Sequence, residues 1–280
     1  MVEHDPSAPT LFDLGAPASS FMDLEDPRYA YMFGFLQADG HLAAGKGRKG
    51  RLSVEINARD MALLEEFQRL TPYNSSLTQR TRATNFAATS HTATWTLCAL
   101  EARTKLNELG LPYGRKSRNI TPPRVPFSRP DYLRGLIDAD GSVGFTKDGL
   151  PFVGLTTQST AIAVYLCRYT RLTLDIPKLP GRNKRDRIYN IMYVREAAVA
   201  LAQHLYTPGA LALDRKKVKA VEVSSWQRPA DAPAPIRRRS WTTLEDRVLL
   251  DAASIKEAAA ALGRTEQSCN LRRWRLLKKK

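Results

Sequence analysis

The sequence predicts an α+β protein of two similar halves, followed by a small unit of three helices. Three observations carry this prediction. A ten-residue motif occurs twice, each copy precedes the same order of strands and helices, and a proline-containing segment separates the last helices from the rest. Each half is expected to run helix, two strands, helix, two strands, helix (αββαββα), with pseudo-twofold symmetry between the halves. The antiparallel sheets of the two halves would form a long saddle curved by sheet twist.

The repeated motif is YMFGFLQADG at residues 31–40 and YLRGLIDADG at residues 132–141. The copies share Tyr, Gly, Ala, Asp and Gly at equal offsets, with apolar exchanges between them. In the first half we expect next a hairpin at 41–58, a helix at 60–70 capped by Asp60, a strand pair at 85–99 and a helix at 100–110. In the second half we expect a hairpin at 142–158 turning at Asp148 and Gly149, a helix at 160–172, a strand pair around 187–195 and a helix at 196–206.

Other segments mark the domain boundaries. Residues 1–27 hold six acidic side chains and no Lys or Arg, which predicts a disordered lead-in. Three prolines followed by three consecutive arginines in QRPADAPAPIRRR predict a linker. After it, Thr242 with Glu245, Ser254 and Thr265 each precede a short helical stretch as caps. The expected domains are the lead-in 1–27, the first half 28–125, the second half 126–226, the linker 227–239 and the three-helix unit 240–280.

The charge indicates a polyanionic partner, because 43 Lys and Arg against 28 Asp and Glu leave +15 and a pI near 9.9. A membrane partner is disfavoured, since no apolar run approaches the roughly 20 residues that span a bilayer. The three cysteines lie far apart and predict neither a disulfide framework nor a zinc site. A cytoplasmic, DNA-associated protein is expected, and frequent Ala and Arg favour a bacterial or phage source with GC-rich DNA.

Small residues explain how the two motif helices can meet. Gly34 and Ala38 lie four residues apart, as do their counterparts in the second copy, so each helix offers a smooth face for close backbone approach. This packing would place Asp39 beside Asp140, at two negative helix ends. The carboxylates repel each other there, so without compensation at least one pKa rises. A divalent cation offers that compensation, and hard oxygen ligands suit Mg²⁺, which keeps waters and takes phosphate oxygens.

The two motifs and the pattern after each resemble the LAGLIDADG homing endonuclease family over residues 28 to about 223. The resemblance implies a single-chain monomer that cuts double-stranded DNA at a long, nearly asymmetric site, as in intron homing. It implies that Asp39 and Asp140 bind Mg²⁺ or another divalent cation such as Mn²⁺, with the Ala38 and Ala139 carbonyls as further ligands. The metals would activate water and stabilise the leaving 3′ oxygen.

Further catalytic residues follow from the same resemblance. Lys116 lies in a segment like the family's lysine-bearing loop, and Lys216, with Lys217 as its alternative, stands in the corresponding place after the second half. Such cations steady charge on the transferring phosphate. Gln158 resembles the residue that orients water, and its expected counterpart is Ala58. The motifs differ where Gln37 faces Asp138, a departure from the family's usual two acids.

DNA contacts are expected on polar strands and turns, mostly to phosphates: Arg48, Lys49, Arg51, Arg80, Arg82, Lys147, Arg182, Lys184, Arg185 and Arg187. The last 41 residues resemble a Myb-like or helix-turn-helix domain. Its expected core is Trp241, Trp274, Leu249, Ile255, Ala259 and Leu262. Its third helix would present Gln267, Asn270 and Arg273 to the major groove.

Two other functions remain open. Some transcription regulators resemble the same fold joined to a helix-turn-helix, and bind DNA without cutting it. Such proteins tend to lack the motif acids, which this sequence keeps in both copies. An intron RNA maturase is the other alternative, and binding of the host intron RNA would test it.

Overall fold

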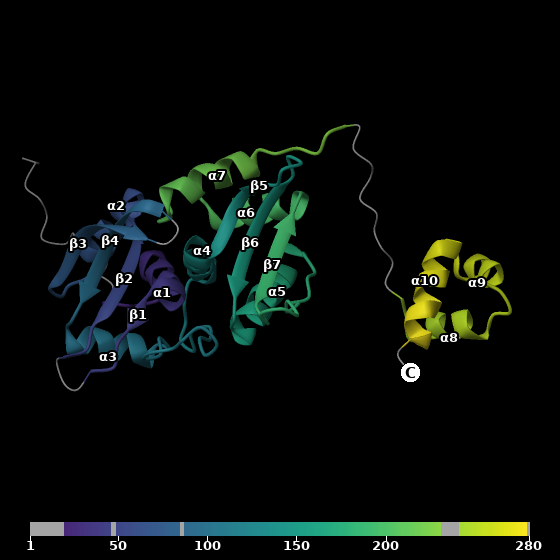
Figure 1. Ribbon diagram of the computed structural model, residues 1–280, viewed down its shortest axis with the longest axis horizontal. Helices are drawn as coiled ribbons and strands as arrows, with labels where there is room; N and C mark the ends of the chain where they lie inside the picture. Colours follow the sequence, from purple (N-terminus) through teal and green to yellow (C-terminus); the bar gives the residue numbers. More distant parts are fainter. Residues whose placement is uncertain (1–19, 46–48, 85–86, 231–240, 279–280) are drawn as a thin grey trace, which may run out of the picture. The chain divides into compact units, whose positions relative to one another are not determined.

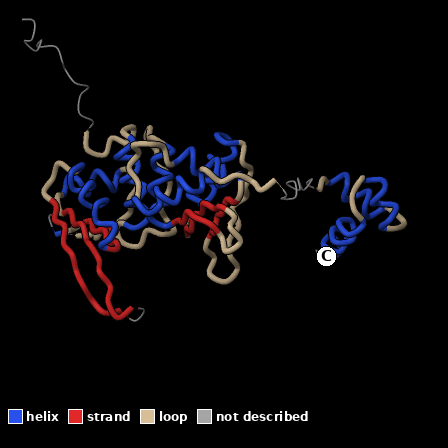
Figure 2. The backbone as a smooth tube through the Cα atoms, turned by 90° about the horizontal axis from the view of Figure 1, so that it is seen from above, coloured by secondary structure: helices blue, strands red, loops and turns tan. Residues whose placement is uncertain are grey.

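The computed structural model describes residues 20–45, 49–84, 87–230 and 241–278, which form two compact units, Met1–Arg228 and Pro229–Lys280. In the first unit the sheets lie on one side and most helices on the other (Figures 1 and 2). None of the described helices is long and apolar enough to cross a membrane. A single hydrophobic core runs through both halves of this unit, so the halves are built as one body.

The first half begins with helix α1, whose N-cap Asp26 accepts a hydrogen bond from the backbone N–H of Arg28. Its elements are α1 (Pro27–Asp39), β1 (His41–Leu42), β2 (Leu52–Asn57), the short 3-10 helix η2 (Ala58–Asp60), α2 (Met61–Leu70), β3 (Ser75–Thr84), β4 (Ala87–Leu97) and α3 (Leu100–Glu108). The antiparallel sheet has the order β1-β2-β4-β3. Leu52 and Val54 point into the core and alternate with outward polar residues.

One expected strand pair of this half is placed differently. The sequence predicted both strands within 85–99, but β4 alone occupies most of that segment and its partner β3 precedes it. The sequence did not predict strand β3, because residues 78–83 are exposed on both faces and show no alternation of apolar and polar residues. The far end of the hairpin projects beyond the helices (Figure 2).

The second half repeats the order with one strand fewer. Its elements are α4 (Arg129–Asp140), β5 (Gly141–Phe145), β6 (Pro151–Thr157), α5 (Thr160–Leu174), β7 (Tyr189–Val194), α6 (Glu196–Leu205) and α7 (Asp214–Ser224). The antiparallel sheet has the order β5-β6-β7. The predicted pair around 187–195 is the single strand β7, preceded by one isolated bridge. Pro177 and Pro180 lack the N–H that a ladder requires, so they explain the missing strand.

Two local predictions need correction. The lead-in was expected to end at residue 27, and residues 1–19 lie outside the described residues, but Met22 and Leu24 are buried in the core. Asp60 stands at the N-cap of α2 without a side-chain capping bond. Its carboxylate instead accepts from Nε of Arg215 at 3.0 Å, which joins the first half to α7.

The second unit contains α8 (Thr243–Asp251), α9 (Ile255–Leu262) and α10 (Glu266–Leu277). The three predicted caps are confirmed, because Thr242, Ser254 and Thr265 each accept from a backbone N–H of the first turn. The predicted linker 227–239 falls largely outside the described residues. The core of this unit is small, with four buried residues at its centre: Leu249, Ala258, Ala259 and Cys269.

Candidate active site at the paired helix ends

Helices α1 and α4 cross at two glycines. A Cβ added at Gly34 would collide with the backbone oxygen of Tyr132, and one added at Gly135 would collide with that of Tyr31. The sequence-predicted close approach is therefore confirmed, with backbone against backbone. Both helices end at the motif aspartates, so this crossing brings Asp39 and Asp140 to the same place.

Two tyrosines of the crossing helices each donate a hydrogen bond to a residue of the other half. Tyr31 donates its hydroxyl proton to Asp138 at 2.8 Å, and the equivalent Tyr132 donates to Oε1 of Gln37 at 2.5 Å. The Asp138 carboxylate also accepts from Tyr206, at 2.7 Å, and burial raises its pKa. Gln37 and Asp138 are thus buried partners of tyrosine hydroxyls. The difference between Gln37 and Asp138 therefore leaves Asp39 and Asp140 as the last residues of α1 and α4.

Asp39 and Asp140 are solvent-accessible, whereas Gln37 and Asp138, two residues before them, are buried. The surrounding protein still displaces enough water to raise the pKa of both carboxyls. For Asp140 desolvation and then the negative charge of Asp39 raise the pKa to about 6. The predicted juxtaposition of the two acids is present as a charge interaction between them.

Two buried lysines, Lys116 and Lys216, compensate the negative charge of Asp39 and Asp140, a role that the sequence had assigned to a divalent cation alone. Lys116 donates to the carbonyl oxygens of Gln37 and Ala38 at the end of α1. Lys216 donates to the carbonyls of Ile137, Asp138 and Gly141 at the end of α4, at 2.6–2.8 Å. Each ammonium therefore neutralises the negative end of one motif helix.

Burial and charge act in opposite directions on these lysines. Desolvation lowers the pKa of Lys116, while Asp140 and Asp39 oppose the fall. The same effect lowers the pKa of Lys216 to about 8. Among the sequence candidates the cluster thus assembles Asp39, Asp140, Lys116 and Lys216, and it selects Lys216 over the neighbouring Lys217.

Strand register corrects the predicted counterpart of Gln158. β1 pairs His41 with Ser53, and β5 pairs Ser142 with Gly154, so the offset between the motifs continues along β2 and β6. At that offset the counterpart of Gln158 is Asn57, not Ala58. Sequence reasoning had aligned the two segments one residue out of register, which turns a side chain to the opposite face. Both halves therefore carry an amide at this position.

The site fits a divalent cation by its chemistry. The described residues contain no group of three or more His, Cys, Asp or Glu side chains that could hold a metal ion. Two accessible carboxylates with raised pKa values nevertheless suit Mg²⁺, which takes one or two carboxylates and completes its shell with waters and phosphate oxygens. Of the two predicted carbonyl ligands, that of Ala38 already accepts from Lys116.

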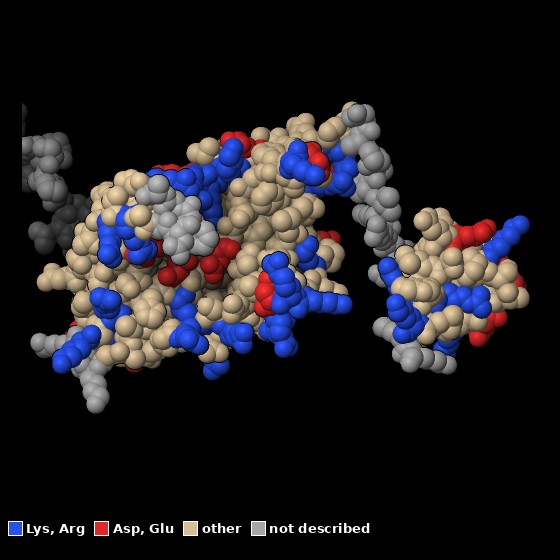
Figure 3. All heavy atoms as spheres, viewed as in Figure 1, with Lys and Arg blue, Asp and Glu red and all other residues tan. Residues whose placement is uncertain are grey.

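The predicted DNA-contacting side chains are mostly exposed and lie on turns and on strand β3, and two of them, Arg182 and Arg187, line one pocket with Gln158. Arg80 and Arg82 lie on β3, where Arg82 pairs with Glu55 at 2.8 Å. Arg48 lies outside the described residues. In the face shown in Figure 3, Lys and Arg spread over both halves and acidic side chains gather near the middle of the unit. The remaining exposed candidates are Lys49, Arg51, Lys147, Arg182, Lys184, Arg185 and Arg187.

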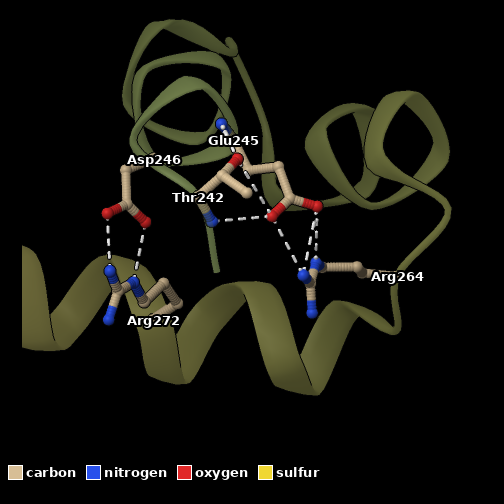
Figure 4. A network of polar contacts seen from close by, with 5 residues as sticks. All are labelled: Thr242, Glu245, Asp246, Arg264 and Arg272. Atoms are coloured by element: carbon tan, nitrogen blue, oxygen red, sulfur yellow. Dashed lines mark hydrogen bonds and ion pairs between the residues drawn. The ribbon is translucent and has the colours of Figure 1, made fainter. Parts of the chain in front are cut away.

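The second unit is held by ion pairs as much as by its core. Glu245 closes the capping box with Thr242 and accepts from Arg264 at 3.0 Å, while Asp246 accepts from Arg272 at 2.5 Å (Figure 4). The guanidinium of Arg264 also stacks 4.1 Å from the Trp241 ring centre.

The predicted core of the second unit needs one correction. Trp274 is 55% exposed, whereas Cys269 on the same helix is buried. Helix α10 thus turns the side that carries Cys269 toward the core and the side that carries Trp274 toward solvent. Leu249 and Ala259 are buried, with Trp241, Ile255 and Leu262 packed around them. Gln267 and Asn270 are exposed on α10, and Arg273 is half-buried.

Comparisons with known proteins identify the fold of the first unit. No family model and no curated protein matches the sequence. Among solved structures, the homing endonuclease I-WcaI bound to its DNA recognition sequence is similar at 18% identity with a TM-score of 0.50, over 74% of this chain and 95% of that chain. Meganuclease I-SmaMI bound to uncleavable DNA aligns at 13% identity with a TM-score of 0.47, over 71% of this chain and 87% of that chain. The duplicated unit therefore has a LAGLIDADG homing endonuclease-like fold.

Proposed function

We propose that this protein is a site-specific endonuclease that hydrolyses both strands of a long, nearly asymmetric DNA site with a divalent cation, Mg²⁺ or Mn²⁺. The observation that carries the proposal is the pair of accessible aspartates at the crossed helix ends, each beside a buried lysine. The similarity in fold to a homing endonuclease bound to its recognition sequence agrees with DNA as substrate. Since one chain supplies both acids, a monomer suffices.

Each residue has a role in this proposal. Asp39 and Asp140 would hold the cation, with the Ala139 carbonyl as a further ligand. A bound divalent cation lowers the pKa of water and stabilises a leaving oxygen. Lys116 and Lys216 keep positive charge beside the scissile phosphates, and the amides of Asn57 and Gln158 would orient water by hydrogen bonds.

A direct test uses plasmid that carries the target, first found by selection from a randomised DNA library. We expect Mg²⁺ to allow conversion of the plasmid to the linear form and EDTA to leave it intact. A protein that binds without cutting would shift the plasmid in both conditions. Intact plasmid at every Mg²⁺ and Mn²⁺ concentration, with specific binding, would refute the nuclease.

The second candidate is a non-cutting DNA-binding regulator. One observation favours it: Lys116 and Lys216 already balance the two aspartates, so the cluster holds no excess negative charge that demands a cation. The plasmid experiment separates the two functions.

The cleavage rate should depend on pH in a bell-shaped manner. Asp140 must lose its proton to bind the cation, so the rate should rise with pH through about 6, and Lys216 must keep its proton, so the rate should fall above about 8. Raising the Mg²⁺ concentration should shift the acid limb to lower pH, because the cation competes with the proton.

Variants assign the alkaline limb. Lys216→Met should remove the fall above about 8 along with most of the activity. Lys219→Met, which changes an exposed ion pair with Glu222 on the same helix, should retain the wild-type profile. A flat profile between pH 6 and 9 in the wild type would contradict these roles.

We also propose that the second unit is a DNA-binding arm of the Myb-like or helix-turn-helix type, with Gln267, Asn270 and Arg273 facing DNA. Removing residues 237–280 should weaken binding and reduce the slope of log affinity against log salt by about 0.9 for each phosphate that this unit neutralises. Titrations between 50 and 300 mM salt measure the slope. Unchanged affinity and slope would show that this unit does not touch DNA.

A further inference from the structure

The two sheets differ in chemistry on the face that points away from the core. Both outward faces lie on the same side of the unit (Figure 2). In the first sheet the outward positions of β2, β3 and β4 are polar: Ser53, Glu55, Asn57, Ser76, Thr78, Arg80, Thr92, Thr94 and Thr96. In the second sheet three outward positions hold large apolar side chains, Phe152, Met192 and Val194, which we name the apolar strip. Neighbouring exposed apolar side chains can mark an interaction surface.

Register identifies polar counterparts in the first half for two of the three strip residues, Met192 and Phe152. Gly154 corresponds to Ser53, and these residues pair with Met192 and Thr96. Met192 therefore stands where the first half has a threonine. Two residues earlier on β6, Phe152 stands where the first half has Arg51, and it pairs with Val194.

The strip is open to a partner. Met192 is 47% and Val194 40% exposed. Gly154, which pairs with Met192, carries no side chain on this face, although an added Cβ would meet its nearest atom, the Ile191 oxygen, at 3.5 Å, an ordinary contact. Gly144 is equally uncrowded, with its nearest atoms in the Phe152 ring at 3.9 Å.

Basic side chains flank the second sheet at both ends and indicate the charge of the partner. They lie on the turn between β5 and β6 and in the segment before β7: Lys147, Lys178, Arg182, Lys184, Arg185 and Arg187. A partner that is both polyanionic and locally apolar is required. The major groove of DNA meets both conditions, because thymine presents a C5 methyl group there between two phosphate backbones.

We infer that Phe152, Met192 and Val194 read thymine through its methyl group, so that the second half selects bases by apolar contact and the first half selects them by hydrogen bonds. This inference rests on the proposed DNA-binding function and adds the chemical basis of its specificity. Nearer the helix ends the outward pair Thr156 and Asn190 is polar, so the methyl contacts fall in the outer part of the second half-site.

Deoxyuridine tests the inference, because it lacks only the methyl group of thymine. The selected target is made with every thymine of one half-site replaced by deoxyuridine, and binding is measured without metal. We expect affinity to fall about fourfold for each buried methyl, equal to about 0.8 kcal/mol, when the second half-site is replaced. Replacement in the first half-site should change affinity less than twofold.

Protein variants link the effect to the strip. The double variant Met192→Asn/Val194→Asn should lose most of the discrimination between the thymine and deoxyuridine targets, whereas Val164→Asn, at an exposed valine on α5, should discriminate as the wild type does. Equal falls in affinity for both half-sites, or none for the second while the unmodified target is bound specifically, would overturn the inference and leave the proposed function standing. A protein that binds no DNA specifically would overturn both.

Discussion

Replacing Asp39 or Asp140 by Asn is expected to reduce double-strand cleavage at least about a hundredfold, since removal of an outer-shell partner alone costs about 10–100-fold in metal affinity or activity. The amide keeps the size of the side chain but neither its charge nor its affinity for Mg²⁺. DNA binding should stay unchanged or strengthen slightly, because each variant removes a negative charge from the surface that faces phosphate. Plasmid cleavage and metal-free binding measure the two effects separately.

Asp148→Asn is the matched control. It makes the same chemical change on an exposed turn of the second half and should cut like the wild type. A nicked plasmid from a single active-site variant would indicate that the remaining acid still serves one strand. Full double-strand cleavage by both variants would rule out the assigned roles.

Gly34→Ala or Gly135→Ala should lower the free energy of unfolding by at least about 2 kcal/mol. Alanine is the better helix former by about 1 kcal/mol, so propensity alone predicts stabilisation. The added Cβ, however, meets a backbone oxygen of the other helix, which cannot rotate away as a side chain would. Overpacking commonly costs about 1–3 kcal/mol, and a rigid neighbour places the expected loss in the upper part of that range or beyond it.

Urea unfolding of the full chain, followed by tryptophan fluorescence and circular dichroism, measures this effect. Gly181→Ala serves as the control, because a Cβ there meets nothing within 4 Å. Equal or greater stability of Gly34→Ala would mean that the helices do not meet at these glycines.

The sequence predicted what repetition and local pattern encode. The motif copies predicted the duplicated order of elements, and the four-residue spacing of Gly34 with Ala38, and of Gly135 with Ala139, predicted the close helix crossing. Side chains that bond to their own first turn, such as Thr242 and Ser254, mark helix starts locally. These features need no knowledge of distant contacts.

The remainder depends on tertiary contacts that no local pattern marks. Residues 78–83 of strand β3 are exposed on both faces, so this stretch lacks the alternation by which strands are recognised. The correspondence of Asn57 with Gln158 requires strand register, which only the pairing reveals. Lys116 and Lys216 were nominated by resemblance, but their role as caps of the helix carbonyls follows from burial in three dimensions.

The exchange of tyrosines between the halves has a consequence for how such a chain can change over time. Tyr31 of the first half donates a hydrogen bond to Asp138 of the second, and Tyr132 of the second half donates one to Gln37 of the first. Each half therefore needs the other to satisfy a buried polar side chain. Separating the halves would leave the buried carboxylate of Asp138 and the buried amide of Gln37 each without one hydrogen-bond donor, which would lower the stability of either half alone. A change at one of these positions is therefore coupled to the tyrosine of the other half, whereas outward sheet positions can change without this constraint.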